Sequence, residues 1–554
     1  MADYYDLGTY ERTVSTTSAE AQRWFNRGLV WTYGFHHEEA VECFEKALEH
    51  DPGLAMAHWG IAYAVGPNYN RQWGDFDEEE KRVYLGRALE AVEAASQRAA
   101  GAEPVERALI GALAVRYPSD PSVEDFGPWN DAYSEAMREV YRANPNDLDV
   151  RALFAEAMMN RTPWHLWDLP GGEPAEGADT LEAVEVLESA FSGLAEQGAN
   201  THPGLLHMYI HLVEMSPHPE KALKAGDALV NLVPDAGHLQ HMATHIDVLC
   251  GHYQNVVARN DLAIVADNKY LARSGAENFY TVYRCHNYHF KIYGAMFLGQ
   301  LQPAMEAADD LAETLTEDVV RPLADWLEAF VPMKQHVLIR FGMWEEIKAQ
   351  ELPEDRELYS VTTALILYAK TVAYSATGDI PGALASRDEF RVAKAAVPES
   401  RVLFNNTCID ILNIAEEMLE GELSYRQGDH DIAFAHLRRS VELDDTLPYD
   451  EPWGWMQPAR HALGALLLEQ GRMDEAEAVY RADLGLDDTL SRASQHPDNV
   501  WSLHGLHECL LFRGETGEAG MIKQRLDMAN ARADVPIEAS CFCRLEHAHA
   551  QSLE

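Results

Sequence analysis

The chain has 554 residues and a formal net charge of −46, which arises from 90 acidic and 44 basic residues. Its length exceeds what one compact hydrophobic core usually holds, and its 47% of hydrophobic residues indicates a folded chain. Nucleic acids and anionic membranes both attract basic surfaces, so the charge argues against either as a partner.

The sequence carries no targeting or membrane signal that we can recognise. No run of about 18 apolar residues occurs, and the first residues, MADYYDLGTYERTV, lack the basic and apolar regions of a secretory signal. Seven cysteines in so long a chain do not form a disulfide framework. We therefore expect a cytoplasmic protein.

Residues 21–54 carry the pattern of a tetratricopeptide repeat, a pair of antiparallel helices. They read AQRWFNRGLVWTYGFHHEEAVECFEKALEHDPGL. Small residues stand where the two helices cross, and aromatic residues fill the gap between them. The positions that match the repeat are Trp24, Gly28, Trp31, Ala40, Phe44, Ala47 and Pro52.

Helical spacing of apolar residues continues over 77–99, 103–117 and 129–143. The irregular segment 160–178 follows, with three prolines, three glycines and two tryptophans. A plain linker is polar, whereas this segment is aromatic. We expect an ordered loop that packs over something, and a lid over a site is the alternative.

Histidines then recur with the 34-residue period of the repeat. If Pro203 begins one unit and Gly237 the next, His207 and His241 are 34 apart, and so are His211 and His245. Gly299 matches Gly251 as the turn between two helices, which places the start of a third unit near Cys285. His286 and His289 then take the positions of His238 and His241.

Later units place glycines at plausible turns between helices, and no long stretch has the alternating pattern of a strand. The fold class predicted is all-α, a tetratricopeptide-repeat α-solenoid that could curl into a closed or toroidal superhelix. We expect one continuous solenoid in three parts: N-terminal helices with the 160–178 loop, histidine-rich helices, and C-terminal helices, over residues 1–200, 201–312 and 313–554. The turn glycines are Gly342, Gly378, Gly428, Gly471 and Gly514.

The strings GFHHEEAVECFEKAL, HPGLLHMYIHLVEMSPHPEKAL, AGHLQHMATHI, CHNYHF and DNVWSLHGLHECL resemble a large microbial family of tetratricopeptide-repeat proteins of about this length. The resemblance spans nearly the whole chain. It implies an α-solenoid and draws attention to the histidines, but this family has no well-established general activity. In such folds the second, fifth, ninth and twelfth positions of each first helix face a concave groove. By that register eight side chains point into one groove: His207, His211, Glu214, His238, His241, His245, His286 and His289.

These eight residues are the predicted metal ligands. Histidines three or four apart share one helical face and can bind one ion. One such pair is weak evidence, but crowded neutral imidazoles leave many buried nitrogens to satisfy, and a metal satisfies them together. A hydrogen-bonded polar core or a pH-responsive cluster is the alternative.

The ligand set favours copper, with zinc and iron as alternatives. Imidazole suits zinc, copper, iron and nickel, and Glu214 is the one obvious carboxylate, whereas a di-iron site needs several glutamates. Two ions with about three nitrogens each favour a copper pair. For zinc hydrolysis Glu214 would be the catalytic base.

The sequence gives weaker support for functions of several other residues. His202, before the first helix, is a further ligand, a packing residue or an outer donor. His218 and His252 are expected to face solvent. Residues at groove positions that could contact a substrate, with ordinary packing as the alternative, are Trp59, Tyr63, Tyr293, His461 and His504.

Cys541 and Cys543 form a Cys-x-Cys pair, which is a weak metal or redox signal. A soft copper site that includes Cys285 is one option, and cysteines without function are the other. The glycine-rich phosphate motifs, the GxSxG elbow and HExxH are absent from the sequence. Nucleotide cofactors and the common hydrolase mechanisms therefore lack support.

These observations lead to three hypotheses. The first is a metal-dependent oxidoreductase, with copper as the most favoured metal, that oxidises a small molecule in the groove. The second is a scaffold that binds a peptide or protein in the groove, the usual function of this fold. The third is a zinc-dependent hydrolase, or metal storage or sensing without turnover.

Overall fold

The computed structural model describes residues 4–120, 122–196 and 202–544. The chain divides into two compact units. Unit 1 comprises Met1–Ile246 and Val265–Lys269, and unit 2 comprises Asp247–Ile264 and Tyr270–Glu554. The boundary between them falls inside the predicted histidine-rich part, 201–312, and the three-part division stays a prediction.

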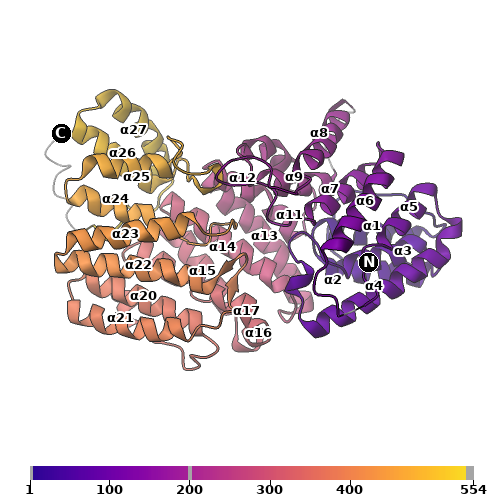
Figure 1. The fold of residues 1–554 in the computed structure, drawn as a ribbon, viewed down its shortest axis with the longest axis horizontal. Helices are drawn as coiled ribbons and strands as arrows, with labels where there is room; N and C mark the ends of the chain where they lie inside the picture. The colour runs from indigo at the N-terminus through magenta and orange to yellow at the C-terminus, as the bar shows by residue number, and fades with distance from the viewer. Residues whose placement is uncertain (1–3, 121, 197–201, 545–554) are drawn as a thin grey trace. The chain divides into compact units, whose positions relative to one another are not determined.

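The regular secondary structure of the described chain is almost entirely helical, which confirms the all-α prediction (Figure 1). Unit 1 contains α1 (Ala19–Tyr33), α2 (His37–His50), α3 (Ala55–Ala64), α4 (Glu78–Arg98), α5 (Pro104–Leu113), α6 (Gly127–Ala143), α7 (Leu148–Met159), α8 (Thr180–Glu196), α9 (Pro203–Val213), α10 (Leu223–Leu229) and α11 (Gly237–His241). Two helices contribute to both units, α12 (Ala243–Leu249) and α13 (Tyr253–Ser274).

Unit 2 continues with helix pairs to the end of the described chain. They are α14 (Tyr280–Leu298), α15 (Leu301–Thr314), α16 (Glu317–Val320), α17 (Ala324–Leu327), α18 (Met333–Arg340), α19 (Trp344–Ala349), α20 (Ser360–Ala376), α21 (Ile380–Ala395), α22 (Cys408–Gln427), α23 (His430–Asp445), α24 (Ala459–Glu469), α25 (Met473–Asp483), α26 (Val500–Arg513) and α27 (Thr516–Asn530).

Other regular structure is short. Two-residue strands, β1 (Val402–Leu403) and β2 (Asn406–Thr407), form an antiparallel hairpin before α22. The 3-10 turns are η1 (Trp73–Asp75), η2 (Ala99–Gly101), η3 (Pro219–Ala222), η4 (Arg321–Leu323), η5 (Glu328–Phe330) and η6 (Arg492–Ser494).

Aromatic side chains seated against glycines hold consecutive helices together. Phe44 of α2 lies between Gly28 of α1 and Gly60 of α3, and a Cβ on either glycine would come within 2.6 Å of its ring. Tyr480 of α25 is seated in the same way between Gly464 of α24 and Gly505 of α26. The repeat therefore uses one packing device in both units, because a missing Cβ lets helices approach closely around a ring.

Turns between paired helices end in left-handed glycines, as the sequence predicts. Gly299 caps α14 with φ of 72°, and Gly428 caps α22 with φ of 89°. Side chains other than glycine adopt this conformation at a cost of roughly 1 kcal/mol or more. In Figure 1, α20 to α25 accordingly run as successive antiparallel pairs.

In the part of the chain that the structure describes, we find no helix with both the length and the apolar character of a membrane span. The cytoplasmic location and the closed superhelix stay predictions.

We expect Gly28→Ala to destabilise the protein, because its new methyl group would overlap the Phe44 ring. The expected loss is about 1–3 kcal/mol, visible as a lower urea midpoint followed by circular dichroism. Gly86→Ala is the matched control, since nothing lies within 4 Å of a Cβ at that position inside α4. It should leave the midpoint unchanged or raise it, and equal losses for both variants would contradict the packing argument.

Candidate metal centre

Helix α9 places two of the predicted ligands on one face. His207 and His211 are one turn apart, and Glu214 is the C-cap residue. The helix begins where the sequence predicts, because Pro203 suits the first turn and the His202 Nδ1 atom accepts a hydrogen bond from the Leu205 backbone N–H at 3.2 Å. His202 is therefore a helix cap in this structure.

The second histidine group lies on α11 and α12, which follow each other closely. Gly237 begins α11, 34 residues after Pro203 begins α9, as the predicted period requires. His238 and His241 lie on α11, and His245 lies on α12. All five histidines and Glu214 belong to unit 1, and none is more than 1% exposed.

Four of the five rings have Nδ1 next to an oxygen. His207 Nδ1 is 2.6 Å from the Tyr33 carbonyl oxygen, and His241 Nδ1 is 3.2 Å from the Thr244 hydroxyl. That hydroxyl donates its own hydrogen to the His241 carbonyl at 2.7 Å, so it accepts from the ring. Each of these contacts assigns the ring hydrogen to Nδ1 and leaves Nε2 with a lone pair.

Glu214 joins the two histidine groups through its carboxylate. Its Oε1 atom is 2.9 Å from His211 Nδ1, and its Oε2 atom is 2.6 Å from His245 Nδ1. An ionised carboxylate only accepts hydrogen bonds, so both imidazoles donate from Nδ1. Carboxylate–histidine contacts of this kind orient metal-binding imidazoles in known sites.

The Nε2 atoms converge on one another. His207 and His238 Nε2 are 3.1 Å apart, and His241 and His245 Nε2 are 2.8 Å apart. One candidate ligand atom from each of His207, His211 and His238 lies within 4.8 Å of the others. Among the described residues, the buried Nε2 atom of His211 has no hydrogen-bond partner.

Three of these rings, His207, His211 and His238, are neutral at pH 7. Burial lowers the pKa of His207 to about 3, and burial together with neighbouring histidines holds the pKa of His211 and His238 well below the usual value. The Nε2 atoms of His241 and His245 lie 2.8 Å apart, close enough for one proton or one cation to lie between them. Imidazole nitrogens gathered in this way are donors that suit a transition-metal ion, so the donor set fits one.

Aromatic rings line the first histidine group and His238 of the second. The Phe35 ring centroid is 4.5 Å from that of His207 and 5.7 Å from that of His238. Tyr69 and Trp164 lie 5.0 and 5.9 Å from the His211 ring. Phe35 and Trp164 both have positive φ, 54° and 60°, a conformation that costs bulky residues roughly 1–3 kcal/mol and clusters at functional sites.

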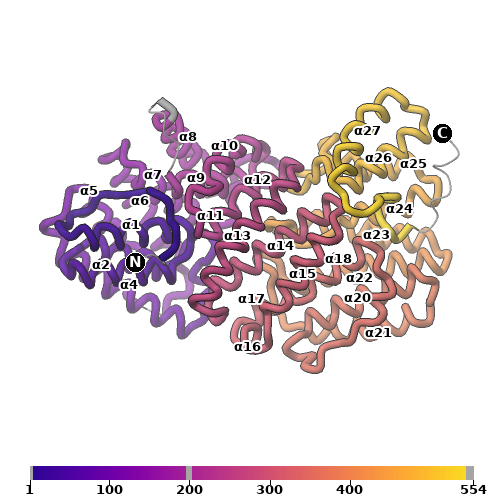
Figure 2. The backbone as a smooth tube through the Cα atoms, turned by 180° about the vertical axis from the view of Figure 1, so that it is seen from behind, coloured from indigo at the N-terminus to yellow at the C-terminus, as the bar shows by residue number. Residues whose placement is uncertain are grey.

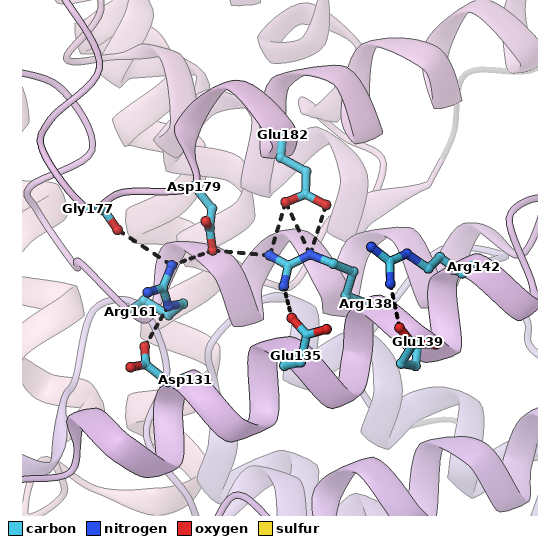
Figure 3. Close-up of polar contacts among 9 residues, drawn as sticks. All are labelled: Asp131, Glu135, Arg138, Glu139, Arg142, Arg161, Gly177, Asp179 and Glu182. Carbon is cyan, nitrogen blue, oxygen red and sulfur yellow. Dashed lines mark hydrogen bonds and ion pairs between the residues drawn. The ribbon is translucent and has the colours of Figure 1, made fainter.

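The irregular segment 160–178 is an ordered loop that packs on α9. The Trp167 indole donates to the Leu212 carbonyl at 2.6 Å, and Trp164 lies against Tyr69 and His211. Figure 3 shows how both ends of the loop are held: Arg161 pairs with Asp179 at 2.6 Å, and Arg138 of α6 contacts Asp179 and Glu182. The loop therefore contributes a wall to the histidine group.

The buried carboxylate of Asp149 lies at the centre of a hydrogen-bond network next to the first histidine group. Asp149 of α7 accepts hydrogen bonds from the Tyr33 hydroxyl at 2.6 Å and the Tyr10 hydroxyl at 2.7 Å, and pairs with Arg12 at 2.6 Å. His202 Nε2 lies 3.3 Å from the same carboxylate. The Tyr33 carbonyl oxygen contacts His207 Nδ1, and the Tyr33 hydroxyl donates to Asp149. The network around Asp149 therefore positions His207, a predicted ligand, through Tyr33.

The remaining predicted ligands, His286 and His289, lie on α14 in unit 2. His289 Nε2 is 2.7 Å from the Met456 sulfur, and burial lowers the pKa of His289 to about 3. That these two join the six residues of unit 1 in one groove stays a prediction.

The predicted substrate residues lie in packed surroundings. The Tyr63 hydroxyl donates to Glu156 at 2.6 Å, and the Trp59 ring lies 5.3 Å from that of Tyr63. His461 Nε2 is 3.0 Å from Asp483, His504 is half-buried on α26, and Tyr293 lines a small pocket in unit 2. Their substrate contacts stay predictions.

Sequence reasoning missed several residues of the site. Phe35, Tyr69 and Thr244 carry no motif, and the Tyr33 contact is made by a backbone carbonyl, which no sequence pattern reports. Trp164 had a signal, the aromatic composition of the 160–178 loop. His218 is exposed, as expected, with 66% of its side chain accessible.

A family comparison supports the repeat at the N-terminus. The tetratricopeptide repeat family matches residues 21–54. Helices α1 and α2 are the two helices of the matched repeat. No curated protein matches the chain.

Solved structures similar to this chain include three helical-repeat proteins. The Naa15/Naa10 structure bound to HypK-THB is 14% identical, with 92% of this chain and 70% of that chain covered and a TM-score of 0.22. The human IFIT1 dimer with PPP-AAAA is 14% identical, with coverages of 91% and 89% and a TM-score of 0.27. Yeast Tom70 is 12% identical, with coverages of 91% and 96% and a TM-score of 0.26.

Asp149→Asn should lower stability at neutral pH. Burial raises the pKa of Asp149, but His202, Arg12 and the Tyr33 hydroxyl outweigh burial and hold the pKa below its ordinary value. The ionised carboxylate therefore stabilises the fold above its unfolded pKa of about 3.9, and this stability is lost as the pH falls through the lower folded pKa. We expect a loss of about 3–5 kcal/mol at pH 7.

The measurement is urea unfolding of wild type and variant from pH 7 to pH 3. The free energies of unfolding of wild type and variant should become more similar as the pH falls below about 4. Glu139→Gln is the control, because Glu139 forms only an exposed pair with Arg142 and should cost less than about 1 kcal/mol. A difference that stays constant with pH would contradict the assignment.

Proposed function

We propose that this protein binds a transition-metal ion in unit 1, through the Nε2 atoms of His207, His211 and His238. The observation that carries the proposal is the convergence of these buried nitrogens while oxygen acceptors hold the opposite Nδ1 atoms of His207 and His211. Three imidazoles are a complete donor set for a site that keeps one position open.

His241 and His245 extend the proposed site. Their Nε2 atoms lie 2.8 Å apart, and the Glu214 carboxylate connects His245 to His211. Five imidazoles are enough for a second ion or for a larger shared site. The alternative is a proton shared by His241 and His245, with Glu214 as the counter-charge.

Glu214 acts as an orienting acceptor in this proposal, whereas the sequence suggests a ligand or a base. Each of its oxygens lies at hydrogen-bond distance from an imidazole Nδ1 atom. A carboxylate engaged in this way positions two ligands and compensates the charge of the ion.

Copper is the ion that we propose first, with zinc and iron as alternatives, because the donor atoms are almost all imidazole nitrogens. Bound copper would supply one-electron and dioxygen chemistry. Oxidation of a small molecule at such a site, with Glu214 and the residues at groove positions assisting, is the most specific form of this proposal.

The second candidate function is a scaffold that binds a protein or peptide. The match of residues 21–54 to the tetratricopeptide repeat family favours it, since stacked repeats of this kind form extended concave binding surfaces. The two functions are compatible, because a buried metal ion could stabilise the scaffold.

Metal content tests the first candidate. We expect the untagged protein, expressed in copper- and zinc-supplemented medium, to hold at least one transition-metal ion per chain by mass spectrometry. The double variant His211→Ala with His245→Ala should lose it, whereas His218→Ala, which changes an exposed turn histidine, should retain it. A wild-type protein that stays metal-free after loading would overturn the proposal and favour the scaffold.

Glu214→Gln tests the orienting function. The amide keeps one acceptor oxygen but faces the second imidazole N–H with a donor, so we expect metal affinity to fall by about 10–100-fold. Competition with a chromogenic chelator measures the affinity, and stoichiometry should return at excess metal. The exposed Glu220→Gln is the control. Unchanged affinity in Glu214→Gln would contradict this function.

A further inference from the structure

Three sulfur-containing residues line a pocket in unit 2. Met418, Cys541 and Cys543 are among its lining residues. Cys541 and Cys543 form a disulfide, and Arg340 and Glu422 line the same pocket. None of these residues belongs to the histidine group of unit 1.

One face of α22 contributes Met418 and Glu422 to the pocket lining. Met418, Glu422 and Arg426 are four residues apart, so they lie along one stripe of the helix. Arg426 bonds Glu422 at 2.8 Å and also donates to the Cys543 carbonyl oxygen. The helix that carries Met418 is therefore fastened directly to the Cys-x-Cys segment.

Contacts outside the disulfide fix the cysteine segment on both sides. Before it, the Ser540 hydroxyl lies 2.5 Å from the Tyr480 hydroxyl, and the Ser540 carbonyl accepts from Arg340 at 3.3 Å. After it, Arg544 makes two bonds of 2.7 and 2.8 Å to Glu508. Figure 2 shows this last, yellow stretch running back beside α24. The two sulfurs should therefore stay beside the pocket when the disulfide is open.

The environment suits reduction followed by binding of a soft cation. Cys541 is partly exposed, so a small thiol or phosphine can reach it, while Cys543 is buried. Thiolate and thioether sulfur are the ligands that monovalent copper prefers. Arg340 lines the pocket and places one positive charge there, which offsets part of the charge of two thiolates, while Arg426 is paired with Glu422.

We propose that this pocket binds one Cu(I) ion through Cys541, Cys543 and Met418 once the disulfide is reduced. In the reduction, two thiol molecules are oxidised to one disulfide, and the protein disulfide takes up two electrons and two protons. Cu(I) then replaces the two thiol protons, which leave to solvent. The pocket is a second metal site, and it stands independently of the histidine centre.

A Cu(I) titration tests the proposal on the full-length chain. Oxidised and phosphine-reduced samples, freed of reductant under anaerobic conditions, are titrated in competition with a chromophoric Cu(I) chelator. We expect the reduced form to bind one more Cu(I) ion per chain than the oxidised form. Taking this difference within one variant cancels any copper held by the histidines.

Substitutions identify the donors. Cys541→Ser with Cys543→Ser should abolish the additional ion, whereas Cys250→Ser, outside the pocket lining, should keep it. Met418→Leu should weaken the additional ion by about tenfold, while Met473→Leu, which packs on the same core without lining the pocket, should not. Circular dichroism checks the fold of each variant. Equal Cu(I) binding by oxidised and reduced protein, or retention of the additional ion by the double serine variant, would overturn the proposal.

Discussion

The structure of unit 1 depends on how six buried polar side chains satisfy one another. Five imidazoles and one carboxylate lie where water has almost no access, and each unmatched nitrogen there costs about 1–3 kcal/mol. The Tyr33 carbonyl, the Thr244 hydroxyl and the two oxygens of Glu214 match four Nδ1 atoms. The Nε2 atoms of these rings then lie close together, at 3.1 Å between His207 and His238 and 2.8 Å between His241 and His245, an arrangement that a cation would stabilise.

The helical-repeat framework makes this concentration of imidazoles possible. Rings seated against glycines, such as Phe44 between Gly28 and Gly60, fix neighbouring helices at short separations. Corresponding positions of successive first helices therefore come together. Histidines that recur with the 34-residue period, such as those on α9 and α11, then lie close to one another. The 160–178 loop and Phe35 then cover the first histidine group with aromatic rings.

Much of the fold and part of the site could be predicted because they follow from periodicity. The 34-residue spacing of His207 and His241 corresponds to helices that begin 34 residues apart, at Pro203 and Gly237. The third unit was placed less well: α14 begins at Tyr280, ahead of the expected Cys285. No glycine or proline marks that start, so the spacing of turn glycines did not predict the added first turn.

The sequence by itself determined the all-α class, the repeat at residues 21–54 and the histidines at regular spacing, because these depend on local patterns of side-chain size and polarity. Only the tertiary structure decided which ring atoms converge, that Glu214 contacts two imidazoles, and that Tyr33, Phe35 and Trp164 belong to the site. Such contacts join residues up to 174 positions apart, as between Tyr33 and His207, and a backbone carbonyl accepts equally well whatever its side chain. Their geometry is set by how helices pack, and a sequence pattern records spacing along one helix rather than distance between helices.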